Sequence, residues 1–89
     1  MQKKILVIED EIAIREMIVF ALENDGFQVV GVENGQLAKQ AMAEFTPDLM
    51  IIDWMLPGVS GLELLRGFRR SASTRTKPII MLTARSEEN

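Results

Sequence analysis

The stretch LMIIDWMLPGVSG, residues 49–61, decides the fold of this chain. It opens with four apolar residues and reaches a charge, Asp53, ahead of a loop that contains one proline and two glycines. A short unbroken apolar run is typical of a strand that is covered on both faces, as in a parallel sheet. Asp53 therefore marks the point at which a buried strand leaves the core.

Strand-like runs alternate with helical patterns along the rest of the chain. Unbroken apolar runs occur at residues 5–8 and 79–82, and a mixed run occurs at 27–32. Apolar residues three and four apart predict an amphipathic helix between each strand and the next. The residues expected to face inward are Ile14, Met17, Ile18, Ala21 and Leu22 in the first helix, Ala38, Ala41, Met42 and Phe45 in the second, and Leu62, Leu65 and Phe68 in the third.

Cap residues bound the three predicted helices. Gly26 suits the left-handed position that ends the first helix, and Asn34 is a good cap for the second. Ser60 and Glu63 have the spacing of a capping box, which predicts the start of the third helix. The turn at residues 46–48 separates the second helix from the strand at 49–53.

This alternation predicts an α/β fold, a doubly wound parallel sheet with helices on both faces. The mixed run at 27–32 fits an edge strand, so we expect the flavodoxin-like strand order 2-1-3-4. The fourth strand, at residues 79–82, is then the other edge, yet it has no polar alternation and no charge. Because such an edge invites pairing, we expect a further βα unit, a partner or an exchanged segment to cover it.

Composition limits the possible chemistry. The 89 residues fit one domain, with 47% hydrophobic and 26% charged residues. The chain has no cysteine and no histidine. Disulfides, zinc sites built on cysteine and nucleophiles activated by histidine are therefore excluded. A metal site must be built from oxygen ligands, which favours magnesium, calcium or manganese.

Charge and hydropathy limit the partners of this chain. The net charge is −3, whereas a domain that grips a nucleic-acid backbone is usually basic. No apolar run approaches the roughly 18 residues of a membrane span, and the N-terminus has no cleavage site of a signal peptide. We therefore expect a cytoplasmic protein with no direct nucleic-acid contact and no membrane contact by this chain.

Acidic residues follow two strands that the predicted order makes neighbours. Glu9 and Asp10 follow the first strand, and Asp53 ends the third. The carboxyl ends of parallel strands share one rim, and ligands bind where the winding direction reverses, here between the first and third strands. Converging carboxylates repel one another unless a proton or a cation neutralises them, and Mg²⁺ is the natural neutraliser.

Two further residues extend this predicted site. The backbone carbonyl of Met55, just after Asp53, is well placed to add a metal ligand, and Thr83 ends the fourth strand on the same rim. A metal at this rim shields the charge of a phosphoryl group from a carboxylate nucleophile. Since aspartate is known to accept phosphoryl groups, the sequence predicts a magnesium-dependent phosphoacceptor.

Three motifs carry a resemblance to a known family. VIEDE at 7–11, DWMLPGVSG at 53–61 and IIMLTA at 79–84 resemble the receiver domain of bacterial two-component response regulators, which has a CheY-like fold. Within that family, IREM at 14–17, Trp54 and LTAR at 82–85 are most similar to the phosphate-regulon type.

The resemblance implies a role for each matching residue. Asp53 accepts a phosphoryl group from the phosphohistidine of a sensor histidine kinase. Asp10, Asp53 and the Met55 carbonyl bind Mg²⁺, and Glu9 assists through water. On phosphorylation, the Thr83 hydroxyl turns to the phosphoryl oxygen, and Ala84 leaves room for it. Pro57 and Gly61 shape the loop beside the site.

The resemblance also implies a partly absent domain. The family carries a lysine after a fifth strand, an aromatic switch residue on that strand and a helix pair for dimerisation, and none of these occurs in residues 1–89. We therefore expect a receiver domain incomplete at its C-terminus, homodimeric when intact. Its output, a DNA-binding transcription regulator, lies outside this chain. As a self-phosphorylating acceptor it is not a turnover enzyme.

Three other functions compete with the phosphoacceptor. A haloacid-dehalogenase-like phosphatase also ends a strand in a nucleophilic aspartate, but it places an acid two residues later, where this chain has Met55. A flavin or nucleotide binder needs a glycine-rich loop after the first strand, where this chain has acids. The strongest competitor is an interaction-only or engineered receiver fragment without a working switch.

Overall fold

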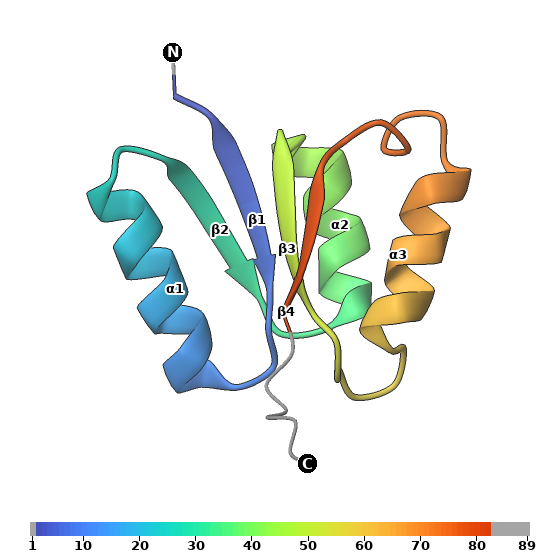
Figure 1. The fold of residues 1–89 in the computed structure, drawn as a ribbon, viewed down its shortest axis with the longest axis horizontal. Helices are drawn as coiled ribbons and strands as arrows, with labels where there is room; N and C mark the ends of the chain where they lie inside the picture. The colour runs from blue at the N-terminus through green and yellow to red at the C-terminus, as the bar shows by residue number, and fades with distance from the viewer. Residues whose placement is uncertain (1, 83–89) are drawn as a thin grey trace.

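The computed structural model describes residues 2–82. The elements alternate between strand and helix along these residues: β1 (Lys4–Ile8), α1 (Ile12–Asn24), β2 (Gln28–Val32), α2 (Gly35–Phe45), β3 (Leu49–Asp53), α3 (Gly61–Arg70) and β4 (Ile79–Leu82). All strand pairs are parallel and their order is β2-β1-β3-β4. Helix α1 lies on one side of the sheet, and α2 and α3 lie on the other (Figure 1). The predicted flavodoxin-like, doubly wound arrangement is confirmed.

The central strands are apolar throughout because both of their faces are buried. Successive side chains of a strand point to opposite faces. In β1, Leu6 and Ile8 pack with α2 and α3, whereas Ile5 and Val7 pack on the side of α1. The edge strand β2 is only partly buried, which agrees with its mixed sequence.

The predicted inward face of α2 is right for Ala38, Ala41 and Met42, whereas Phe45 is only half-buried; the other two helices need a larger correction. In α1, Ile18 and Leu22 contact the core as expected, but Met17 is 63% exposed and Ala21 is exposed as well. Val19 packs inward in their place, so the buried stripe is rotated around the helix. Apolar residues surround much of α1, and periodicity alone does not select one face.

In α3 the correction concerns the leucines. Leu64 and Phe68 are buried, whereas Leu62 and Leu65 are only half-buried on the flanks. The buried stripe of α3 therefore begins at Gly61 and continues through Leu64 to Phe68.

Each helix has the boundary that its cap residues predict. Gly26 adopts φ +96°, a left-handed conformation that glycine tolerates, just after α1. The Asn34 side chain accepts a hydrogen bond of 2.8 Å from the Leu37 amide at the start of α2. Ser60 and Glu63 form the reciprocal capping box of α3.

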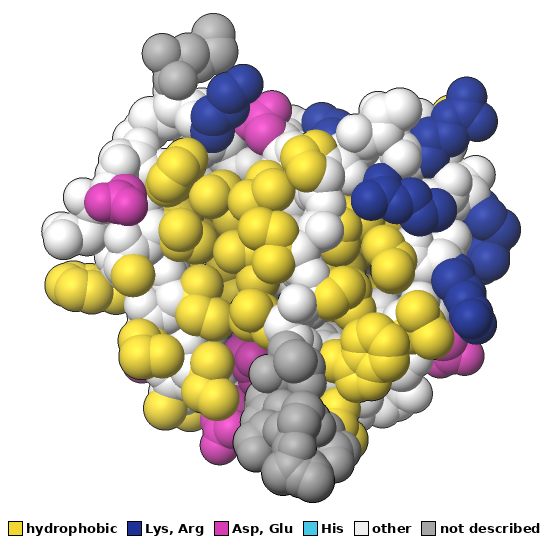
Figure 2. All heavy atoms as spheres, viewed as in Figure 1, with side chains coloured by type: hydrophobic (Ala, Val, Ile, Leu, Met, Phe, Trp, Pro, Cys, Tyr) yellow, Lys and Arg dark blue, Asp and Glu magenta, His cyan; other side chains and the backbone are white. Residues whose placement is uncertain are grey.

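One side of the sheet is only partly covered within residues 2–82. Helix α1 lies over β1 and β2 and leaves β4 at the opposite edge, where Ile80 is 48% exposed. Figure 2 shows apolar side chains gathered over the middle of this view. The expectation that a further βα unit, a partner or an exchanged segment covers the edge at β4 stays a prediction.

Candidate functional site

Three carboxylates meet where β1 and β3 end. The strand register pairs Ile8 with Ile52, so the next residues along the two strands, Glu9 and Asp53, come side by side. One carboxylate oxygen each from Glu9, Asp10 and Asp53 lies within 4.8 Å of the other two. Glu9 and Asp10 are adjacent in sequence, and Asp53 follows them by 44 and 43 positions. The strand order thus brings the three acids together at the rim that was predicted from the sequence.

Two of these acids are buried, which makes their charge expensive. Glu9 and Asp53 are each 5% exposed, whereas Asp10 is exposed. Burial raises the pKa of Glu9 above its ordinary value, against the opposing effect of a hydrogen bond from the Glu11 amide. The neighbouring charges of Asp53 and Asp10 raise this pKa further. The site therefore carries more negative charge than its own surroundings neutralise.

The orientation of the Asp53 carboxylate is fixed by the backbone that follows it. The Met55 amide donates a 3.2 Å hydrogen bond to Asp53 Oδ1. The Trp54 amide donates to the Leu82 carbonyl of β4 at 2.8 Å, which extends the β3–β4 ladder past Asp53. The hydrogen bond from Met55 therefore helps to set the direction in which the Asp53 carboxylate faces.

Gly61 is the residue that lets α3 begin directly behind Asp53. Its amide donates to the Trp54 carbonyl at 3.1 Å. A Cβ at this position would overlap the carbonyl oxygen of Asp53 and would lie 3.0 Å from the Trp54 Cα. Only glycine permits this close backbone approach. The resemblance assigned Gly61 to the shape of the loop, and the contact with Asp53 gives the physical reason.

Arg15 is a residue of this region that sequence reasoning missed. Its Nη1 donates a 2.9 Å hydrogen bond to the backbone carbonyl of Glu9, so α1 ties down the segment that presents Glu9 and Asp10. Arg15 lies one helical turn after Glu11, and the first turn of α1 lies close to the end of β1. This position could have indicated a contact between Arg15 and the segment after β1.

The other residues predicted for the site are placed only in part. The amide of Met55 lies beside Asp53, and its side chain is exposed. Thr83 and Ala84 lie outside the described residues.

The three carboxylates fit a hard divalent cation. They supply oxygen ligands only, from the ends of two adjacent strands, and Mg²⁺ prefers such ligands while keeping several waters. Within residues 2–82, no lysine or arginine side chain donates a hydrogen bond to these carboxylates. Burial and the neighbouring acids raise the pKa of Glu9, so its charged form is disfavoured unless a cation balances it.

The chain belongs to the response regulator receiver domain family, which matches residues 5–89. Among its relatives, the phosphate regulon transcriptional regulatory protein PhoB of Klebsiella pneumoniae is 51% identical over 88 residues, and PhoB of Rhizobium meliloti is 49% identical over 89 residues. These matches cover 99% and 100% of this chain but only 38% and 39% of the relatives' length. The predicted resemblance to the phosphate-regulon type is confirmed.

Solved structures agree with the fold. The chemotaxis response regulator CheY4 of Vibrio cholerae superposes with a TM-score of 0.91 at 28% identity, over 98% of this chain and 72% of that one. The N-terminal domain of a response regulator receiver protein from Methanoculleus marisnigri gives a TM-score of 0.88 at 30% identity, over 96% and 69%.

Proposed function

We propose that this chain is the phosphoacceptor part of a phosphate-regulon-type response regulator, with Asp53 as the acceptor. The observation that carries the proposal is the cluster of Glu9, Asp10 and Asp53, three carboxylate oxygens within 4.8 Å at the reversal point of the sheet. Membership in the receiver domain family supports the same role. The fold alone would not specify this role, since one fold hosts many functions.

The reaction is a displacement at phosphorus. A carboxylate oxygen of Asp53 attacks the phosphorus of a phosphohistidine on a sensor histidine kinase, a P–O bond forms and the P–N bond breaks. The leaving imidazole nitrogen takes a proton from solvent. Asp10, Asp53 and the Met55 carbonyl would hold Mg²⁺, and Glu9 would assist through water. When bound, the ion neutralises the charge that carboxylate and phosphoryl oxygens bring together.

The chain's own residues prepare this step before any ligand arrives. The Met55 amide fixes the rotation of the Asp53 carboxylate, and Gly61 lets the following loop fold back onto the Asp53 backbone. Such fixed orientation lowers the entropic cost of reaching the transition state. Thr83 and Ala84 then serve as the switch pair that reads the phosphoryl group.

The wider role follows from the same proposal. The chain acts in the cytoplasm, takes its phosphoryl group from a sensor histidine kinase and controls a DNA-binding output that it does not itself contain. It is an acceptor that is modified once, not an enzyme that turns over an external substrate. Homodimerisation, or exchange of a strand that covers β4, is the expected assembly. No helix within residues 2–82 has the length and apolar character to cross a bilayer.

The test uses a small phosphodonor and intact mass. Incubation with acetyl phosphate and Mg²⁺ should add one phosphoryl group, which should vanish when Mg²⁺ is chelated and in Asp53→Asn. Asp48→Asn is the matched control, because Asp48 adjoins the same strand at its other end and should leave phosphorylation unchanged. A mass gain that survives in Asp53→Asn, or no gain in a folded protein, contradicts the proposal.

One observation favours a second function for the chain. The half-exposed Ile80 on the edge strand β4 leaves an apolar surface for another chain, as an interaction-only receiver fragment would need. In that case circular dichroism should show a folded protein that gains no phosphoryl mass. The protein should also form a complex with another chain, and an Ile80→Lys substitution should abolish this complex.

A further inference from the structure

A groove of about 700 Å³ lies between α2 and α3, on the side of the sheet away from α1. This volume is in the range of sites that hold small organic molecules, about 300–1,000 Å³. Its apolar lining comes from both helices, from the turn between α2 and β3 and from the loop before α3: Met42, Ala43, Pro47, Val59, Leu64 and Phe68. None of the acids of the candidate phosphoacceptor site lines it.

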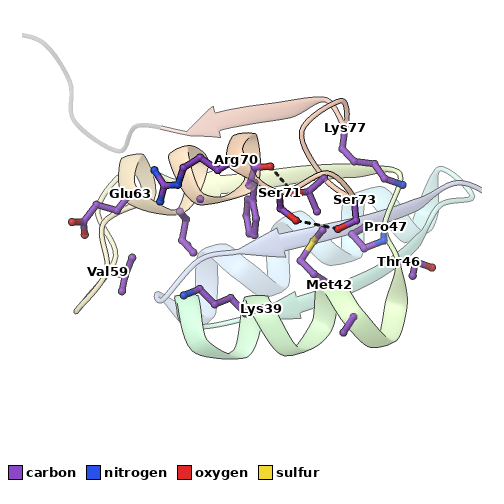
Figure 3. Close-up of a pocket in the computed structure, with 15 residues that line it drawn as sticks. Lys39, Met42, Thr46, Pro47, Val59, Glu63, Arg70, Ser71, Ser73 and Lys77 are labelled. Atoms are coloured by element: carbon purple, nitrogen blue, oxygen red, sulfur yellow. Dashed lines mark hydrogen bonds between the residues drawn. The ribbon is translucent and has the colours of Figure 1, made fainter.

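Positive charge surrounds this groove in a chain whose net charge is −3. Lys39, Arg70 and Lys77 line it, and Glu63 is the one acidic residue among its described lining. Figure 3 shows Lys39 on α2, Arg70 at the end of α3 and Lys77 just before β4, around the same opening. Figure 2 shows cationic side chains gathered on the α3 side of the molecule.

One end of the groove is polar and held in place. Ser71 and Ser73 share a hydrogen bond of 3.3 Å there, beside Lys77 and Thr46 (Figure 3). The buried Thr74 hydroxyl donates to the Phe68 carbonyl at 2.6 Å and anchors this loop to α3.

Arg69 fixes the same loop from outside the groove. Its Nη1 donates to the carbonyls of Arg75 and Lys77 at 2.7 and 2.8 Å. The hydroxyls and the lysine are therefore presented by a loop that is ordered before any ligand binds, which reduces the entropic cost of binding.

We propose that this groove binds a small amphiphilic anion. The anionic group lies at the end formed by Ser71, Ser73 and Lys77, and the apolar body lies along the accessible side chains of Met42 and Val59. Hydroxyl donors beside a lysine suit a carboxylate or a sulfonate. A nucleotide fits less well, because Phe68, the one aromatic side chain of the described lining, is buried and offers no free face for a base.

The test compares a charged and an uncharged probe on the ¹⁵N-labelled chain. Decanoate should cause saturable NMR shift changes in α2, α3 and residues 71–77, and its binding should weaken as salt is added. Decanol, which has the same apolar chain and no charge, should bind roughly tenfold more weakly.

Two substitutions on opposite walls of the groove locate the site. Lys77→Gln should weaken decanoate binding several-fold and Lys39→Gln should weaken it less, whereas Lys3→Gln, which removes a lysine outside the groove, should leave it unchanged. Circular dichroism checks that each variant is folded. The proposal is overturned if the shifts map to α1 and β4 instead, if decanol binds as tightly as decanoate, or if the three variants behave alike. Phosphorylation of Asp53 is measured separately, so neither result decides the other.

Discussion

Glu9 and Asp48 lie at opposite ends of the neighbouring strands β1 and β3, and their surroundings move their pKa values in opposite directions. Glu9 follows the last residue of β1, where burial raises its pKa and Asp53 and Asp10 add to the effect. Asp48 lies at the start of the strand pair, where its carboxylate accepts a 2.8 Å hydrogen bond from the Lys4 amide and its pKa is lowered.

The difference separates a carboxylate that serves the fold from one that serves a ligand. Asp48 is satisfied by a backbone donor, with lysines nearby to favour its charge. Glu9 accepts one amide hydrogen bond, yet its position among other acids still disfavours its charge. The acids at the carboxyl ends of β1 and β3 therefore lower the stability of the fold, and a bound cation would relieve this effect.

The largest expected effect comes from disturbing the backbone contact that lies behind Asp53. Gly61→Ala places a Cβ against the Asp53 carbonyl, and both groups belong to backbone that cannot move independently. We expect a loss of about 3 kcal/mol in unfolding free energy, measured by urea denaturation, with weaker Mg²⁺ binding in whatever folds.

Gly67→Ala is the control for this substitution. A Cβ on Gly67 meets nothing within 4 Å, and alanine favours a helix over glycine by about 0.5–1 kcal/mol. This variant should therefore be slightly more stable than the parent. If the two alanine variants lose stability equally, the close approach of α3 to Asp53 does not exist in solution.

The next effect comes from removing one charge at the acidic edge. Glu9→Gln keeps an oxygen that accepts the Glu11 amide but loses the buried charge. Without Mg²⁺ at neutral pH, we expect a gain of about 1 kcal/mol in unfolding free energy, because repulsion from Asp53 and Asp10 is relieved. Mg²⁺ should then stabilise the variant less than the parent in thermal denaturation.

Glu16→Gln is the matched control, since Glu16 is exposed in the middle of α1. It should change neither the stability without metal nor the response to Mg²⁺. A Glu9→Gln variant that is less stable than the parent without metal contradicts the view that this edge carries uncompensated charge.

The strand order could be predicted from sequence because burial on two faces leaves a simple mark. Unbroken apolar runs distinguish the buried strands β1 and β3 from β2, whose Gln28 and Gly31 are exposed; β4 has a similar run, although Ile80 is half-exposed within residues 2–82. The buried face of α1 could not be predicted in the same way. Apolar residues such as Met17 and Val19 lie on different sides of this helix, and only the contact with the sheet determines which of them is buried.

The candidate site also has features that could be predicted from the sequence and features that could not. Glu9, Asp10 and Asp53 were predictable because strand ends in a parallel sheet share a rim. The contacts of Arg15 with the Glu9 carbonyl and of Gly61 with the Asp53 backbone depend on how α1 and α3 return to the sheet. The position of Arg15 one turn after Glu11 hints at its contact, but no sequence spacing indicates the close approach of Gly61 to Asp53.

The smallest expected effect concerns Asp48, at the amino ends of β1 and β3, and is measured as the pH dependence of stability. The pKa of Asp48 is lowered below its ordinary value of 3.8, chiefly by the Lys4 amide, so Asp48 favours the folded state above that value. This contribution is lost as the pH falls through the lowered pKa. Asp48→Ala should therefore be less stable than the parent near neutral pH, and the difference in urea midpoint should shrink in acid as the charge of Asp48 is lost.

Asp48→Asn separates the charge from the hydrogen bond at this edge. Its amide oxygen can still accept from the Lys4 amide, but it has no charge for Lys3, Lys4 or Lys77 to attract. We expect a stability between those of the parent and Asp48→Ala near neutral pH. In acid the protonated parent should converge on the asparagine variant, because both then present a neutral acceptor. A difference between parent and Asp48→Ala that stays constant with pH would show that Asp48 acts by packing, and the contrast with Glu9 would then not be electrostatic.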